Sequence, residues 1–148
     1  MPARFGRAGL IDDVPVEVSK AILTGLVPPG DTIEVGFEGG GPVDRSRSGE
    51  ATTSLAPRAA DAWRECKATL TRFFTPALGF DDILRINVLD GVRIHFENGD
   101  VAHIRPSGNA PQLRIYANSD SQARADRIVE LGLGEPDGIL RLLERAFS

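Results

Sequence analysis

The chain has 148 residues, of which 41% are hydrophobic, and its formal net charge at pH 7 is −4. This length and apolar content suffice for a globular domain with a core, and the acidic balance argues against a nucleic-acid-binding surface. The sequence has no run of about 18 apolar residues, so no membrane span is predicted, and the N-terminus lacks the pattern of a signal peptide. Cys66, the single cysteine, excludes an internal disulfide. We therefore expect a cytoplasmic protein that binds neither nucleic acid nor membrane.

The N-terminal third predicts one helix, one strand and one loop. Residues 1–26 carry apolar side chains at helical spacing, entered through Pro15, in a segment too small to fold by itself. Apolar and polar residues alternate over 32–37, which predicts a strand. Residues 39–54 contain three consecutive glycines, a proline and many polar residues. We interpret this stretch as a mobile loop or linker.

The remaining residues predict a sheet with helices on it. A long amphipathic helix is expected from residue 56 to the region of Pro76, and two further helices are expected at 121–131 and 139–147. Four strands are expected between them, at 83–89, 92–96, 101–105 and 113–117. Asp90-Gly91 and Asn98-Gly99 tolerate positive φ and predict antiparallel hairpins. The expected fold class is α+β, with a four-stranded antiparallel sheet covered by helices, and Trp63, Phe73 and Phe74 anchoring the long helix.

The segment from Arg105 to Asn109 has the composition of an anion site. It offers a guanidinium, the Ser107 hydroxyl, backbone N–H groups around Gly108 and a side-chain amide within five residues. An arginine fork matches two phosphate oxygens, and period-two alternation on the next strand places Arg114 on a polar face. Composition alone leaves an ordinary hairpin loop as the alternative, with Arg114 a solvated strand residue.

The run Arg105-Pro-Ser-Gly-Asn-Ala-Pro111, followed by Leu113-Arg-Ile-Tyr116, closely resembles the signature of the last domain of α-D-phosphohexomutases, the family of phosphomannomutases and phosphoglucomutases. The likeness covers about residues 82–131 and includes the hairpin at Asp90-Gly91. It implies a TBP-like fold that binds substrate phosphate through Arg105, Ser107, Gly108, Asn109 and Arg114. Asn109-Ala110 stands where the commoner loop has Thr-Glu, which resembles the phosphomannomutase-like branch, and Asn118 stands where relatives often have Glu.

The resemblance also implies a reaction. Such isomerases interconvert hexose 1-phosphates and 6-phosphates by passing a phosphoryl group between an enzyme phosphoserine and the sugar, with magnesium and a bisphosphate intermediate. This sequence contains neither the family's phosphoserine loop nor its metal loop. We therefore expect no catalytic residue, metal site or bound cofactor in this chain, no activity of the chain alone, and magnesium in the full-length enzyme. The expected partners are a hexose phosphate or bisphosphate and the remaining domains.

A weaker likeness at Pro2–Phe5 and residues 9–19 to the end of the preceding domain suggests an excised piece of that enzyme. The expected division is a hinge segment at 1–30, a strand and flexible linker at 31–55, and the phosphate-binding domain at 56–148. The alternative is a complete small protein that uses the fold as a noncatalytic phospholigand sensor or assembly module.

Other residues that attract attention have simpler interpretations. His95 and His103, on strands at either side of Asn98-Gly99, are polar-face residues rather than a metal pair, because a third ligand is missing. Asp12-Asp13 and Asp81-Asp82 are interpreted as helix-cap and turn residues. Cys66 is expected to be buried or inert.

Overall fold

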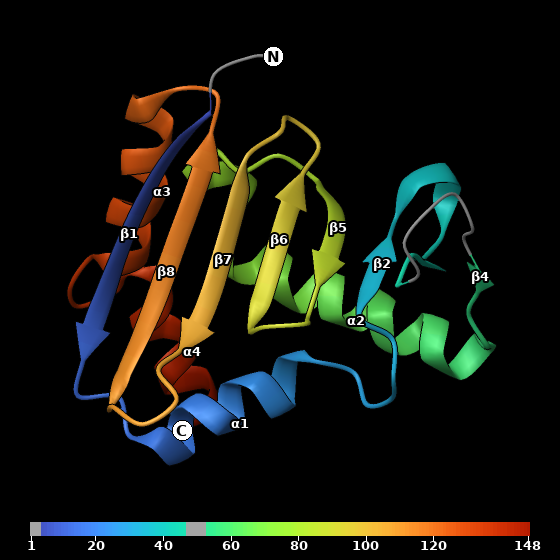
Figure 1. The fold of residues 1–148 in the computed structure, drawn as a ribbon, viewed down its shortest axis with the longest axis horizontal. Helices are drawn as coiled ribbons and strands as arrows, with labels where there is room; N and C mark the ends of the chain where they lie inside the picture. Colours follow the sequence, from blue (N-terminus) through green and yellow to red (C-terminus); the bar gives the residue numbers. More distant parts are fainter. Residues whose placement is uncertain (1–3, 47–52) are drawn as a thin grey trace.

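The structure is a computed structural model of the chain, and it describes residues 4–46 and 53–148. Over these residues the strands form one sheet in which every neighbouring pair is antiparallel. The strands are β1 (Phe5–Asp12), β2 (Glu34–Gly36), β3 (Val43–Asp44), β4 (Thr53–Ser54), β5 (Ile83–Asn87), β6 (Val92–Phe96), β7 (Val101–Pro106) and β8 (Gln112–Ser119). Their order across the sheet is β1-β8-β7-β6-β5-β2-β3-β4 (Figure 1).

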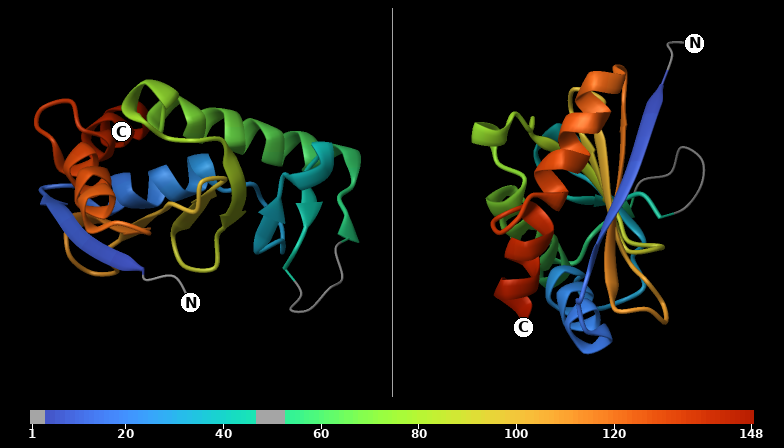
Figure 2. Two further views of the ribbon diagram at one scale, coloured as in Figure 1. Left: turned by 90° about the horizontal axis from the view of Figure 1, so that it is seen from above. Right: turned by 90° about the vertical axis from the view of Figure 1, so that its left-hand side faces the viewer.

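The helices lie on one side of this sheet. They are α1 (Val16–Leu26), α2 (Pro57–Phe73), α3 (Gln122–Leu133) and α4 (Ile139–Phe147), with short 3-10 turns η1 (Glu38–Gly40) and η2 (Pro76–Leu78). Figure 2 shows α2, α3 and α4 against the same face, and α1 packs on α4 near one end of the sheet. Within the described ranges no helix covers the opposite face, which we call the open face (Figure 2). No helix in the described part of the chain is long and apolar enough to cross a membrane.

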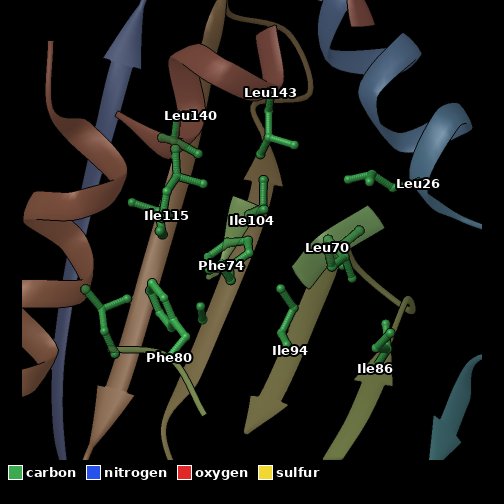
Figure 3. Close-up of a cluster of buried hydrophobic side chains, with 14 of the residues drawn as sticks. Leu26, Leu70, Phe74, Phe80, Ile86, Ile94, Ile104, Ile115, Leu140 and Leu143 are labelled. Carbon is green, nitrogen blue, oxygen red and sulfur yellow. The ribbon is translucent and has the colours of Figure 1, made fainter. Parts of the chain in front are cut away.

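The core fills the space between the sheet and the helices. Each of the four strands β5 to β8 contributes a fully buried isoleucine, and Figure 3 shows these side chains beneath Leu70, Phe74, Leu140 and Leu143 of the helical layer. The four isoleucines are Ile86, Ile94, Ile104 and Ile115. Burial of one such side chain stabilises the fold by roughly 1.5–3 kcal/mol. The apolar phase of the period-two pattern therefore fixes which face of every central strand points inward.

Local chemistry sets where these elements begin and end. Pro57 occupies the first turn of α2, where its missing N–H is not needed. Ser121 caps α3, because its hydroxyl accepts a hydrogen bond from the backbone N–H of Arg124 at 3.1 Å. The Arg124 side chain then donates through Nε to the buried carboxylate of Asp100 at 3.0 Å. α3 is thereby tied to the turn between β6 and β7.

The predicted four-stranded sheet is wrong in its number of strands. The four expected strands are present as β5 to β8, and both hairpins at Asp90-Gly91 and Asn98-Gly99 are confirmed. The structure adds β1 beside β8, β2 beside β5, and the two-residue strands β3 and β4 within the stretch expected as a loop. β2 corresponds to the single strand predicted over 32–37, which was not assigned to the sheet.

β1 escaped notice because it lacks the alternating pattern. It is an edge strand in which only Ile11 is buried, and it contains Gly6 and Gly9. Gly9 faces α3, and a Cβ there would lie 2.5 Å from Cδ1 of Leu133, so the leucine side chain would have to move to admit a larger residue. A glycine at this position interrupts the apolar pattern by which a strand is recognised.

Two expectations are not decided by these elements. The division into segments 1–30, 31–55 and 56–148 stays a prediction. So does the mobility of the stretch 39–54, of which residues 47–52 lie outside the described residues.

The helix-cap interpretation of Asp12-Asp13 is wrong, because Pro15 is the N-cap of α1 and Asp13 instead adopts a positive φ of 64° in the turn before it.

Candidate functional site

The predicted anion site lies at one end of the open face. Arg105 is on β7 and Arg114 on β8, and the two are direct cross-strand partners. Cross-strand partners point to the same face, and Ile104 beside Arg105 is buried on the other, so both guanidinium groups belong to the open face. Ser107, Gly108 and Asn109 form the connection between the two strands. The structure therefore brings all five predicted residues into one short hairpin.

The loop between β7 and β8 leaves backbone donors free. The Ser107 N–H donates to the carbonyl oxygen of Gln112 at 3.2 Å, which closes the base of the loop. Within the described residues, the N–H groups of Gly108 and Asn109 have no hydrogen-bond partner, and neither do the side chains of Ser107 and Asn109. Both residues at the tip are exposed. These donors are thus available to a ligand at no internal cost.

Gly108 has no structural reason to be glycine in the free chain. Its φ is not positive, and a Cβ built on it would meet nothing within 4 Å. Glycine also serves where a ligand must approach the backbone closely. The open space above Gly108 is compatible with that use.

Asp90 forms a solvent-exposed ion pair with Arg105. Its carboxylate lies 3.2 Å from Nε of Arg105, which leaves both terminal nitrogens of the guanidinium free to form a fork. The turn that carries Asp90 is pressed against β7. The Asp90 carbonyl contacts Nε2 of His103, and a Cβ on Gly91, whose φ is +71°, would lie 2.2 Å from the carbonyl oxygen of Ile104. Asp90 was predicted only as a turn residue, and its role depends on this close approach of two hairpins.

Arg114 is oriented less firmly. Its Nη2 donates to Oε1 of Gln112 at a long 3.4 Å, and its Nε is buried without a hydrogen-bond partner among the described residues. A buried N–H without an acceptor is unfavourable by about 1–3 kcal/mol. The Arg114 side chain would have to shift for a bound anion to reach this N–H.

The open face contains further basic residues that the sequence analysis did not assign to a site. Arg85 on β5 lies opposite His95 on β6, and Arg93 on β6 lies opposite His103 on β7. The two histidines share a face but are not cross-strand partners. The His103 ring instead lies 5.8 Å from the Tyr116 ring on β8. Period-two alternation together with strand order would have revealed this cluster, and strand order is what the sequence lacked.

Burial governs the titration of two other groups. The pKa of His95 is lowered, chiefly by removal from water and next by the neighbouring Arg85. Burial raises the pKa of the Cys66 thiol to about 12, so this cysteine on α2 is a poor nucleophile, as predicted.

Over residues 4–46 and 53–148, no three His, Cys, Asp or Glu side chains are grouped so that they could hold a metal ion. Asp81 and Asp82 instead cap backbone N–H groups at the start of β5.

The sequence matches a family model over residues 47–131, which is more than half of the chain. That model describes the C-terminal domain of phosphoglucomutase and phosphomannomutase. The chain belongs to this family. The matched stretch runs from residue 47, between β3 and β4, into α3 and contains β5 to β8 with the whole β7–β8 loop, so the predicted resemblance is confirmed. As a phosphohexomutase C-terminal domain, the chain has the expected α+β architecture.

Individual relatives agree. A phosphomannomutase of Salmonella muenchen is 51% identical over 59 residues, which are 38% of this chain and 12% of that protein. A phosphomannomutase of Sinorhizobium fredii is 40% identical over 70 residues, 45% of this chain and 14% of the relative. A probable phosphoglucosamine mutase of Methanosphaera stadtmanae is 42% identical over 52 residues, 35% of this chain and 12% of the relative. The matches thus span about an eighth of the length of these relatives.

Proposed function

We propose that this C-terminal domain grips the phosphate of a hexose phosphate or hexose bisphosphate for a phosphohexomutase of the phosphomannomutase type. The observation that carries the proposal is the β7–β8 hairpin, in which two cross-strand arginines flank a loop with two backbone N–H groups that have no partner among the described residues. Arg105 supplies the fork, Ser107 and Asn109 supply side-chain donors, Gly108 lets the phosphate approach the backbone, and Arg114 adds charge.

The division of labour follows from what the hairpin contains. Its groups donate hydrogen bonds and positive charge, and none of them is placed to attack or to transfer a phosphoryl group. The described residues do not fit a magnesium ion, so we assign the magnesium of the family reaction, like its phosphoserine, to the remaining domains of a full-length enzyme. The role of this domain is positioning. It holds the phosphate that does not react while chemistry occurs at the other end of the sugar.

The test is kinetic and uses the full mutase polypeptide that the proposal implies. Arg105→Ala should lower kcat/KM about tenfold to a hundredfold, because a charge-assisted hydrogen bond contributes roughly 1.5–3 kcal/mol. Arg105→Lys should also lower it clearly, since lysine keeps the charge but loses the fork. Arg114→Ala should have a smaller effect.

Arg72→Ala is the matched control, because Arg72 is an exposed arginine in the last turn of α2, behind the sheet. It should leave kcat/KM unchanged. Unchanged turnover and sugar-phosphate affinity in folded Arg105→Ala would contradict the proposal. The alternative is a noncatalytic sensor. It would be favoured if the chain bound a phospholigand but no longer polypeptide containing it had mutase activity.

A further inference from the structure

A second group of basic residues lies on the open face, away from the β7–β8 loop. It consists of Arg85, Arg93 and His95 on β5 and β6, and we call it the β5–β6 cluster. Arg85 and His95 are cross-strand partners, and His95 and Arg93 are two residues apart on one strand, so all three point to the same side. Ile86 and Ile94, the fully buried partners between them, point into the core. The cluster is therefore on the same face as Arg105.

These arginines have no acidic partner among the described residues. Over the described residues, neither Arg85 nor Arg93 forms an ion pair or a side-chain hydrogen bond, and Nε of Arg85 is buried without an acceptor. By contrast, Arg45, whose side chain lies over Gly36 next to Arg85 in the sheet, is paired with Glu38 at 2.7 Å. A guanidinium that is partly withdrawn from water and left unpaired is unfavourable unless an anion is bound.

The surroundings of His95 indicate a positive local potential. Burial and Arg85 lower the pKa of His95, Arg93 and Arg4 act in the same direction, and only Glu34 opposes them. Glu34 is already engaged, because its Oε1 accepts a hydrogen bond from Nδ2 of Asn87 at 3.1 Å. A neutral imidazole here can donate one hydrogen bond to an oxyanion, and a bound anion would favour its protonation.

A hollow borders this cluster at Arg93, and none of the residues that line it belongs to the β7–β8 loop. It has a volume of about 390 Å³ and is lined by Arg93, His103, Tyr116, Asn118 and two smaller residues. Arg93 borders it on the side of the cluster, and His103 stands two residues before Arg105 on β7. Arg93 and Arg105 are thus offset by about 7 Å along the strands and about 5 Å across them. This is the scale of a single small ligand.

We propose that the β5–β6 cluster is a second oxyanion site, and that it takes a phosphate group through Arg85 and Arg93 with His95 between them. It goes beyond the proposed function, because none of its residues belongs to the β7–β8 loop. The phosphate has two conceivable sources, the far end of a bisphosphorylated sugar held at the loop or a separate phosphorylated molecule. The chemistry of recognition is the same for both.

Titration of the 148-residue chain with inorganic phosphate at constant ionic strength tests the site, read by nuclear magnetic resonance. The Nε–H signal of Arg85 should shift saturably, and the pKa of His95 should rise as the anion binds. In the double variant Arg85→Gln, Arg93→Gln the Arg85 signal is lost, so the response is read at His95, where it should be weakened about tenfold or more. Arg72→Gln, which removes the same charge behind the sheet, should not weaken it. If the double variant does not fold, Arg93→Gln alone serves, since Arg93 is exposed.

The same spectra separate the two proposals. Shifts at Gly108 and Asn109 without a saturable response at Arg85 and His95 would overturn the second site and leave the proposed function standing. A saturable response at Arg85 and His95 without shifts at Gly108 and Asn109 would support the second site and overturn the proposed function. A response at the cluster that survives the double variant would also overturn the second site.

Sugar ligands identify the source of the phosphate. If one ligand bridges both sites, glucose 1,6-bisphosphate should bind about tenfold more tightly than glucose 6-phosphate, and Arg93→Gln should abolish this difference. If the second phosphate comes from a separate molecule, Arg93→Gln should leave both sugar affinities unchanged while still suppressing the response of the cluster to inorganic phosphate. Either result supports the site.

Discussion

The two faces of the sheet are formed by the same strands but present different kinds of side chain. The covered face presents branched apolar side chains to α2, α3 and α4, and its central residues are fully buried. The open face presents four arginines and two histidines from β5 to β8, and Nε of Arg85 and of Arg114 has no partner among the described residues. We therefore expect substitutions on the covered face to affect the free energy of unfolding and substitutions on the open face to affect the proposed phosphate binding. Ile104 and Arg105, neighbours on β7, stand on opposite sides of this division.

The largest effect is expected on the covered face. Ile104→Ala removes a fully buried side chain and leaves a cavity, and it should lower the free energy of unfolding by about 2–5 kcal/mol. Denaturant unfolding followed by circular dichroism measures this loss. Phosphate affinity of the folded fraction should not change. A loss below about 1 kcal/mol would mean that the core tolerates a void beneath the binding hairpin.

A smaller loss is expected where the two hairpins touch. Gly91→Ala places a Cβ at a φ of +71° and 2.2 Å from the carbonyl oxygen of Ile104, so the turn must shift. The unfolding free energy should fall by roughly 1–3 kcal/mol. Because Asp90 would move with the turn, phosphate binding at Arg105 should weaken as well. Gly41→Ala is the matched control, since a Cβ there meets nothing within 4 Å.

The smallest stability effect is expected at the tip of the binding loop. Gly108→Ala adds a Cβ into open space, so the unfolding free energy should change by less than about 0.5 kcal/mol. Binding of a hexose 6-phosphate should nevertheless weaken, because the Cβ would occupy the space in which we propose that the phosphate approaches the backbone. Isothermal titration calorimetry measures this. Unaltered affinity would remove Gly108 from the site.

The sequence predicted the local structure of the central hairpins well and the extent of the sheet poorly. β5 to β8, α2, α3 and α4 carry clear periodicity, and Asp90-Gly91 and Asn98-Gly99 determine their own turns. β1 is a glycine-containing edge strand whose partners lie 100 or more residues away, and nothing local specifies that pairing. Two-residue strands such as β3 are likewise defined only by their neighbours.

The candidate site shows the same limit: residues close in sequence could be grouped, but contacts between strands far apart in sequence could not be predicted. Arg105, Ser107, Gly108, Asn109 and Arg114 are close in sequence, so the hairpin pattern and the family resemblance sufficed to group them. The contact of Asp90 with Arg105 and the β5–β6 cluster depend on which strands lie side by side and in what register. Alternation alone places a residue on a face but does not say which residues of other strands lie beside it.

The most direct test asks whether stability and phosphate binding depend on different faces of the sheet. The free energy of unfolding is measured for Ile104→Ala and Arg105→Ala, each with and without mannose 6-phosphate. The ligand is present at ten times the dissociation constant of the unmodified chain. At that concentration the ligand should stabilise the unmodified chain by about 1.4 kcal/mol. We expect Ile104→Ala to be strongly destabilised yet to keep this increment, and Arg105→Ala to unfold like the unmodified chain yet to lose it. An Arg105→Ala variant that is itself destabilised and still gains the full increment would contradict the account.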